Sequence, residues 1–218
     1  MLGFRFTAAC VLAVLSVQIL ASEGPPTTGT TSPPKPTETA QPFTCTITCK
    51  ETTVELGKAP TITVAITNLT KQEAVFVGSL DGSESKLRFP HYGFTVIDAT
   101  GKDTLNMGFR MCGNTNALRE ADFVKIATEK SFNPYANDAG FFGPYGLNKE
   151  SFSKPGIYRV TLRYSGKNDD IKQWAGDSRD TAAADVKLAA LFKQVPKLEL
   201  TSNTLTITVV APPAVIQK

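Results

Sequence analysis

The chain of 218 residues contains one histidine, one tryptophan and four cysteines, and it has no long run of charges of either sign. A Ser-His-Asp or Cys-His pair would have to use His91, but the surrounding stretch FPHYGF offers no nucleophile. Carboxylates are dispersed, and zinc spacings, phosphate loops and dinucleotide fingerprints are missing. We therefore expect a protein that is not an enzyme and that holds no cofactor.

Charge and hydrophobicity disfavour two further classes of function. The 23 Lys and Arg residues stand against 20 Asp and Glu, and they are scattered rather than grouped along a surface that could follow a phosphate backbone. Beyond residue 21 there is no apolar stretch of the ~20 residues that a spanning helix needs. We expect no nucleic-acid partner and no membrane span in the mature chain.

The N-terminus has the pattern of an export signal. Arg5 precedes an apolar stretch over residues 6–21, and small residues surround a cleavage point before Ser22. A retained membrane anchor is the alternative, but polar residues interrupt this stretch and it is short for a span. We predict a signal peptide over residues 1–21 and a secreted or periplasmic protein.

A Thr/Pro-rich segment follows the signal. Residues 23–42 include no large apolar side chain, so they cannot bury enough surface to offset the entropy of ordering. We predict a disordered tether over residues 22–42. The remaining residues, 43–218, suit one domain with a sizeable core.

Alternation of apolar and polar side chains predicts strands along this domain. In SKPGIYRVTLRYSG, for example, Tyr158, Val160, Leu162 and Tyr164 fall on one side of an extended chain. The predicted strands, about seven in number, lie within residues 43–49, 60–68, 73–77, 87–97, 123–126, 157–164 and 203–210. Short strands separated by turns predict an all-β antiparallel sandwich.

One segment has a helical period instead. Residues 181–195 place apolar side chains at i, i+3, i+4 and i+7, namely Leu188, Leu191, Phe192 and Val195. Asp180 or Thr181 could cap the helix, and Pro196 would end it. We predict a helical insertion over about residues 168–196, between the last two strands, that covers an open end or face of the sandwich; a partner-binding role is the alternative.

Three stretches resemble immunoglobulin-like domains. Tyr158, just after Pro-Gly, resembles the tyrosine corner of these sandwiches, whose hydroxyl bonds to upstream backbone. ELGKAPTITVAITN resembles the first strand pair of bacterial extracytoplasmic immunoglobulin-like domains, and SNTLTITVV resembles their closing strand. The resemblance implies an immunoglobulin-like β-sandwich. The core Trp and paired Cys of antibody domains are missing, because Trp174 lies in the insertion and Val160 takes the place of the second cysteine.

Removal of the signal would leave three cysteines. Cys45 and Cys49 in one extended strand would lie ~13 Å apart, beyond the ~7 Å limit for a disulfide. Either one of them pairs with Cys112, or the segment is bent, or all three stay reduced. We take a disulfide between Cys49 and Cys112 as the prediction, since export favours a bridge.

Two groups of side chains are candidate sites. Aromatics stand among glycines and prolines in residues 133–148, where they could anchor a partner or instead fold inward onto the core: Tyr135, Phe141, Phe142 and Tyr145. A second set would provide soft ligands for copper but equally well fills a core: His91, Met107, Met111 and Cys112. Asn68-Leu-Thr70 is a glycosylation sequon, which matters only in a eukaryotic secretory host.

These observations predict an exported, non-enzymatic binding or accessory domain whose partner is a protein or a carbohydrate at an extracytoplasmic surface. A protease inhibitor is one alternative, because some secreted sandwiches of this kind inhibit cysteine proteases, but the motifs of their inhibitory loops are not found here. A copper-binding periplasmic carrier is the other.

Overall fold

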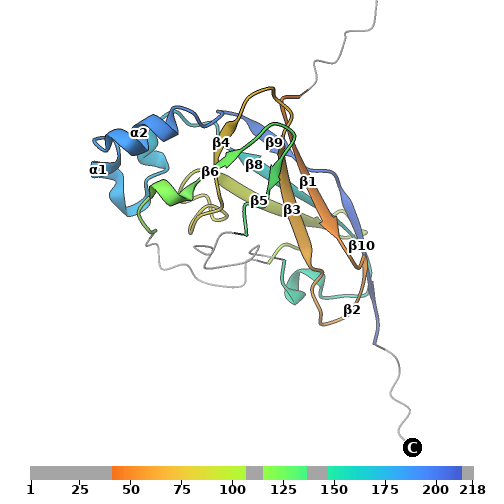
Figure 1. Ribbon diagram of the computed structural model, residues 1–218. Coiled ribbons are helices and arrows are strands. Elements are labelled where there is room, and N and C mark those ends of the chain that lie inside the picture. Colours follow the sequence, from red (N-terminus) through yellow and green to blue (C-terminus); the bar gives the residue numbers. More distant parts are fainter. Residues whose placement is uncertain (1–40, 107–114, 137–146, 213–218) are drawn as a thin grey trace, which may run out of the picture. The chain divides into compact units, whose positions relative to one another are not determined.

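The described residues of the computed structural model are 41–106, 115–136 and 147–212, all within one compact unit (Figure 1). They are mostly β, with few helices. The strands are β1 (Phe43–Cys49), β2 (Thr53–Glu55), β3 (Ile62–Asn68), β4 (Ala74–Val77), β5 (His91–Ile97), β6 (Phe123–Ile126), β7 (Ser131–Phe132), β8 (Gly156–Ser165), β9 (Glu199–Thr201) and β10 (Leu205–Val210). The α-helices are α1 (Arg179–Ala182) and α2 (Val186–Phe192), and the 3-10 turns are η1 (Glu120–Asp122), η2 (Lys149–Phe152), η3 (Ile171–Gln173) and η4 (Gly176–Ser178).

The strands form three sheets. The first has the order β1-β3-β7, the second has the order β2-β10-β8-β5 with β9 also paired to β8, and β4 pairs with β6 in the third. All of these pairs are antiparallel except β2 with β10, which are parallel, so the expectation of a purely antiparallel architecture is wrong at this edge.

The core lies between the first and second sheets, where β1 and β3 lie across β5 and β8 (Figure 1). The predicted alternation in β8 is confirmed, because Tyr158, Val160, Leu162 and Tyr164 are all buried. Ile47 of β1 is buried in the same cluster. Each fully buried side chain of this size contributes roughly 1.5–3 kcal/mol to the free energy of folding.

The described part of the chain holds ten strands rather than about seven. The extra strands, β2, β7 and β9, have two or three residues each. In β2 and β9 one buried apolar residue stands between two exposed polar residues, which is too short a pattern to predict a strand from sequence.

The insertion differs from its prediction in two ways. The single helix is split, because Asp185 accepts hydrogen bonds from the amides of Lys187 and Leu188 and so starts a new helix, α2. In addition, two strands follow the insertion, since β9 pairs with β8 before β10 begins.

The insertion covers the third sheet. Trp174, Leu188 and Phe192 form a second apolar cluster with Val75 and Val77 of β4. Lys197 closes the end of α2, because its ammonium donates to the Phe192 carbonyl at 3.2 Å and lies 3.5 Å from the centroid of the Phe192 ring.

A buried arginine connects the insertion to the rest of the domain. The Arg88 guanidinium, only 2% exposed, donates to the carbonyls of Asn116 and Trp174 and lies 3.5 Å from the Asp81 carboxylate. Burial lowers the pKa of Arg88 from its usual value, and the carboxylate of Asp81 opposes that shift. These bonds tie three separate segments of the chain to one side chain.

Candidate binding site

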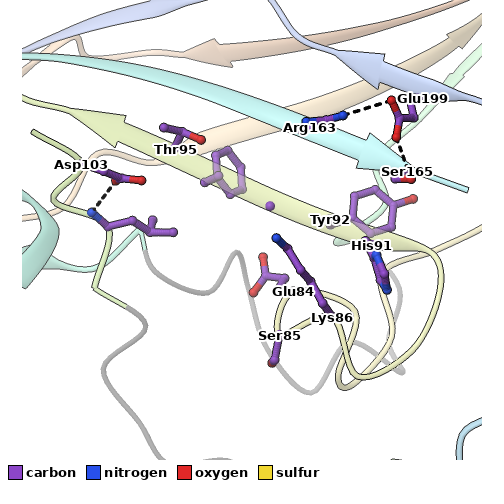
Figure 2. Close-up of a pocket in the computed structure, with 13 residues that line it drawn as sticks. Glu84, Ser85, Lys86, His91, Tyr92, Thr95, Asp103, Arg163, Ser165 and Glu199 are labelled. Carbon is purple, nitrogen blue, oxygen red and sulfur yellow. Dashed lines mark hydrogen bonds and ion pairs between the residues drawn. The ribbon is translucent and has the colours of Figure 1, made fainter. Parts of the chain in front are cut away.

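A hollow with a volume of about 740 Å³ lies along the edge of β5 (Figure 2). It is bounded by residues 84–86 and 91–95, by Asp103 and Leu105, and by Arg163, Ser165 and Glu199 of β8 and β9. We call this hollow the β5 slot. A volume of this size is typical of pockets for small molecules.

The floor of the β5 slot includes an open strand edge. In β5, the N–H and C=O of alternate residues point away from β8: Tyr92 donates outward to the Ser83 carbonyl, and the Val96 carbonyl accepts from Thr104. Phe94 lies between them and shares their orientation. Its outward N–H and C=O make no hydrogen bond to a described residue, so this edge can pair with a ligand.

Both ends of this open edge are closed. At the His91 end, the Tyr92 amide bonds to the Ser83 carbonyl at 3.4 Å. At the Ile97 end, the Thr104 amide donates to the Val96 carbonyl at 2.7 Å. The free edge therefore spans only the residues from Tyr92 to Val96, about 14 Å at the usual rise of a strand.

A cation and an anion stand at opposite ends of the slot. Lys86 lies beside β5 near its His91 end, and Asp103 lies beyond Thr95 at the other end (Figure 2). No ion pair between described residues includes Lys86. One Asp103 oxygen, Oδ1, accepts from the Leu105 amide at 3.0 Å, and Oδ2 accepts no hydrogen bond from a described residue.

The other charged side chains of the slot are engaged. Arg163 pairs with Glu199 at 3.0 Å. The Glu84 carboxylate accepts from the Tyr135 hydroxyl at 2.7 Å.

Lys86 has a φ of 61°, a conformation that costs a side-chain-bearing residue roughly 1 kcal/mol. Glu129 shares this conformation in an ordinary turn, so the angle supports a role for Lys86 only together with its place in the slot.

Gly93 widens the slot at its centre. It is cross-strand from Arg163, and a Cβ built at Gly93 would meet no atom within 4 Å. A glycine inside a strand weakens it, and such a glycine often marks a place where a ligand or another backbone approaches closely. A glycine inside the alternating run of residues 91–97 is the signal for this site in the sequence, but the predicted site residues did not include Gly93, Lys86, Phe94 or Asp103.

His91 is stacked on a neighbouring ring, and the serine opposite it bonds to another residue. Its ring stacks on Phe89 with the centroids 3.9 Å apart, and burial together with the nearby charge of Lys86 lowers the pKa of His91. Ser165 is cross-strand from His91, but its hydroxyl donates to Glu199 at 3.3 Å. A Ser-His pair needs the serine bonded to the imidazole.

The predicted binding loop is described only in part. Tyr135 packs against the main core, with its ring 5.8 Å from that of Tyr92, and its hydroxyl bonds to Glu84. Burial raises the pKa of Tyr135 well above its usual value. Phe141, Phe142 and Tyr145 lie outside the described residues.

The predicted copper set is also described only in part, because Met107, Met111 and Cys112 lie outside the described residues. Within the described ranges, no three His, Cys, Asp or Glu side chains gather as metal ligands. The two described cysteines form no disulfide with each other: Cys45 is buried, and the Cys49 Sγ lies 3.0 Å from the Glu51 carbonyl oxygen. Their strand is regular along its whole length, so the bent-segment alternative is wrong, and the pairing of Cys49 with Cys112 stays a prediction.

Two other side chains have structural roles. The Tyr158 hydroxyl donates to the Lys154 carbonyl at 2.9 Å and accepts from the Lys154 amide at 3.2 Å. The Asn68 amide group is buried and donates to the carbonyls of Gln72 and Ile126. In the folded domain this sequon is therefore closed to glycan addition.

A second hollow of about 410 Å³ lies beside the insertion, lined by Asp169, Ile171, Phe192 and Lys197 among others. Burial lowers the pKa of Lys197 to about 8, but its ammonium is already held by the Phe192 carbonyl. Its described lining residues belong to η3, to α2 and to the segments beside them and not to a strand, so this hollow is the weaker candidate for strand addition.

Comparison with known proteins identifies no family for the chain. No protein-family model and no curated protein match it. Among solved structures, it is similar to the CARDB domain of the PF1109 protein from Pyrococcus furiosus, determined in complex with di-metal ions. The match covers 77% of this chain and 87% of that chain at 11% identity, with a TM-score of 0.25. So low a score carries no argument about the fold, the function or a metal in this chain.

Within the described residues, no helix is both long enough and apolar enough to cross a membrane.

Proposed function

We propose that this protein is an exported, non-enzymatic binding domain with an immunoglobulin-like β-sandwich fold, and that its ligand occupies the β5 slot. The observation that carries the proposal is the outward edge of Phe94 at the floor of a hollow of about 740 Å³. An unpaired strand edge is a liability that proteins usually cover. An edge left open inside a pocket, and closed on both sides of it, is suited to a ligand.

The proposed fold rests on two features. Two sheets contribute to one core, and Tyr158 is bonded to backbone four residues upstream, as in a tyrosine corner. The proposed export rests on the apolar N-terminal stretch of the sequence. The proposal of a non-enzymatic role is supported by His91, whose ring stacks on Phe89 while the Ser165 hydroxyl donates to Glu199.

An NMR titration tests the binding function. Pooled short peptides and pooled oligosaccharides, each at millimolar concentration, are added to the labelled protein. We expect at least one pool to shift the amide resonances of residues 91–95 and of Arg163, which line the slot.

A matched pair of variants assigns the binding to the slot. Gly93→Tyr places a ring in the slot where a Cβ meets no atom, so we expect the shifts to vanish. Thr63→Tyr adds the same ring at an exposed position of β3, away from the slot, so we expect the shifts to persist. Shifts that survive Gly93→Tyr, or no shift with either pool, would overturn the proposal.

A further inference from the structure

Resting on this proposed function, we propose that the ligand is a short peptide of about four residues with free termini, which adds to the edge of β5 as an antiparallel strand. Its C-terminal carboxylate lies at Lys86 and its N-terminal ammonium at Asp103. Three features of the slot select this ligand: its hydrogen-bonding edge, its length and its charges.

The hydrogen-bonding edge selects a peptide backbone. Phe94 presents an N–H and a C=O on the same open side, and an added strand can bond to both groups. Each peptide residue carries one donor and one acceptor in the same arrangement, so one ligand residue opposite Phe94 satisfies both groups. A carbohydrate would instead need an exposed aromatic face to stack on, whereas Tyr92 and Phe94 are buried.

The length of the open edge limits the ligand. The free edge from Tyr92 to Val96 is about 14 Å long, and four extended residues span about the same distance. Ser83 and Thr104 already pair with the two ends of this edge, so a longer strand would meet them. The slot therefore suits a peptide that begins and ends within it.

The charges of the slot fix the direction of the peptide. Lys86 lies at the end where β5 begins, and Asp103 lies where β5 ends (Figure 2). A carboxylate placed at Lys86 and an ammonium placed at Asp103 belong to a chain that runs opposite to β5. The open edge at Phe94 accepts a strand in either direction, so the two charges set the antiparallel orientation.

Tetra-alanine is the probe, because it has both charged termini and the smallest side chains that keep an extended backbone. In an NMR titration we expect it to shift the Phe94 amide and to slow the hydrogen exchange of that amide. Amidating the C-terminus removes the charge that faces Lys86, and we expect affinity to fall about threefold to fivefold, as for a partly exposed ion pair.

Two protein variants identify the contact at each end. In Lys86→Gln, free tetra-alanine should bind as weakly as the amide does to the wild type, and amidation should have no further effect. In Asp103→Asn, which keeps the oxygen that accepts from Leu105, N-acetylation should likewise have no further effect. If amidation weakens binding equally in Lys86→Gln and the wild type, the proposed orientation is wrong.

N-methyl peptides test the backbone pairing. In an antiparallel strand only alternate amides face β5, so N-methylation at one of the two central residues should abolish binding and at the other should leave it within about twofold. Equal tolerance of both methyl groups would overturn strand addition.

The outcomes separate this inference from the proposed function. If tetra-alanine leaves the slot resonances unmoved while an oligosaccharide shifts them, the peptide inference falls and the binding function stands. If neither shifts them, both fall.

Discussion

At the scale of single residues, two buried tyrosines of β8 have opposite hydrogen-bonding states. The Tyr158 hydroxyl makes two bonds to the backbone of Lys154. The Tyr164 hydroxyl is buried and has no partner in the described part of the chain. The two residues stand on the same face of one strand, so they form a natural pair for comparison.

We expect Tyr158→Phe to destabilise the domain by about 1–3 kcal/mol, because it leaves the Lys154 carbonyl without its donor. Tyr164→Phe should change stability by less than about 0.5 kcal/mol or raise it, because it removes a buried hydroxyl that bonds to nothing described. Urea unfolding of both variants measures the difference. Equal losses in the free energy of unfolding of the two variants would mean that the hydrogen bonds of the Tyr158 hydroxyl do not stabilise the domain.

Cys45 makes the stability of the folded domain depend on pH in alkaline solution. Burial raises the pKa of the Cys45 thiol from 9.0 to about 11 in the folded state. Below pH 9 the Cys45 thiol is neutral in both the folded and the unfolded chain, so its contribution to the free energy of unfolding is fully present. As pH rises through 9 to 11 the unfolded chain ionises first, so stability is lost over this window.

We expect wild type to lose stability relative to Cys45→Ala between pH 8 and pH 11, a window that contains both pKa values. Both proteins contain the same tyrosines and lysines, so the effect of ionising these residues on the free energy of unfolding cancels in the comparison. Urea unfolding at several pH values provides the measurement. If the difference in the free energy of unfolding between the two proteins stays constant from pH 8 to pH 11, burial does not raise the pKa of the Cys45 thiol.

At the scale of elements, the insertion shows how a cap decides where a helix begins. The helical period of residues 181–195 is real, yet Asp185 bonds to the amides of Lys187 and Leu188 and divides the segment. Asp180 is exposed within α1 and makes no capping bond to a described residue.

We expect Asp185→Ala to cost about 1 kcal/mol in the free energy of unfolding, the usual value of an N-cap. Asp180→Ala removes the same carboxylate from an exposed site of the same segment, and it should cost less than about 0.3 kcal/mol. Thermal or urea melts compare the two. A larger effect at Asp180 would place the functional cap where the sequence pattern first suggested it.

At the scale of the whole molecule, the apolar stretch over residues 6–21 bears on the compartment in which the protein acts. A binding domain with an open strand edge would meet its partners outside the cytoplasm if residues 1–21 are a signal peptide. The Thr/Pro-rich residues 22–42 would then act as a spacer.

We expect the exported protein to begin near Ser22, because small residues end the apolar stretch there. Intact-mass measurement of material recovered from the exporting host determines the start. A mass that includes residues 1–21 would contradict cleavage and would favour a retained anchor.

The sequence by itself determined the main strands and their buried faces. Alternation is a local property of a half-buried strand, so Ile62, Val64 and Ile66 of β3 could be assigned inward from residue types alone. The helical period of the insertion was also local, although competition between caps was not visible in it.

Only the tertiary structure decided the short strands, the docking of the insertion through Arg88 and the β5 slot. Each depends on segments that are far apart in the chain: the slot combines residues 84–105 with Arg163, Ser165 and Glu199 of β8 and β9, and β5 lies at the edge of its sheet. A one-dimensional pattern shows which side of a strand is buried, but it does not show which strand lies at the edge. That order is set by packing, and it leaves the Phe94 N–H and C=O open to a ligand.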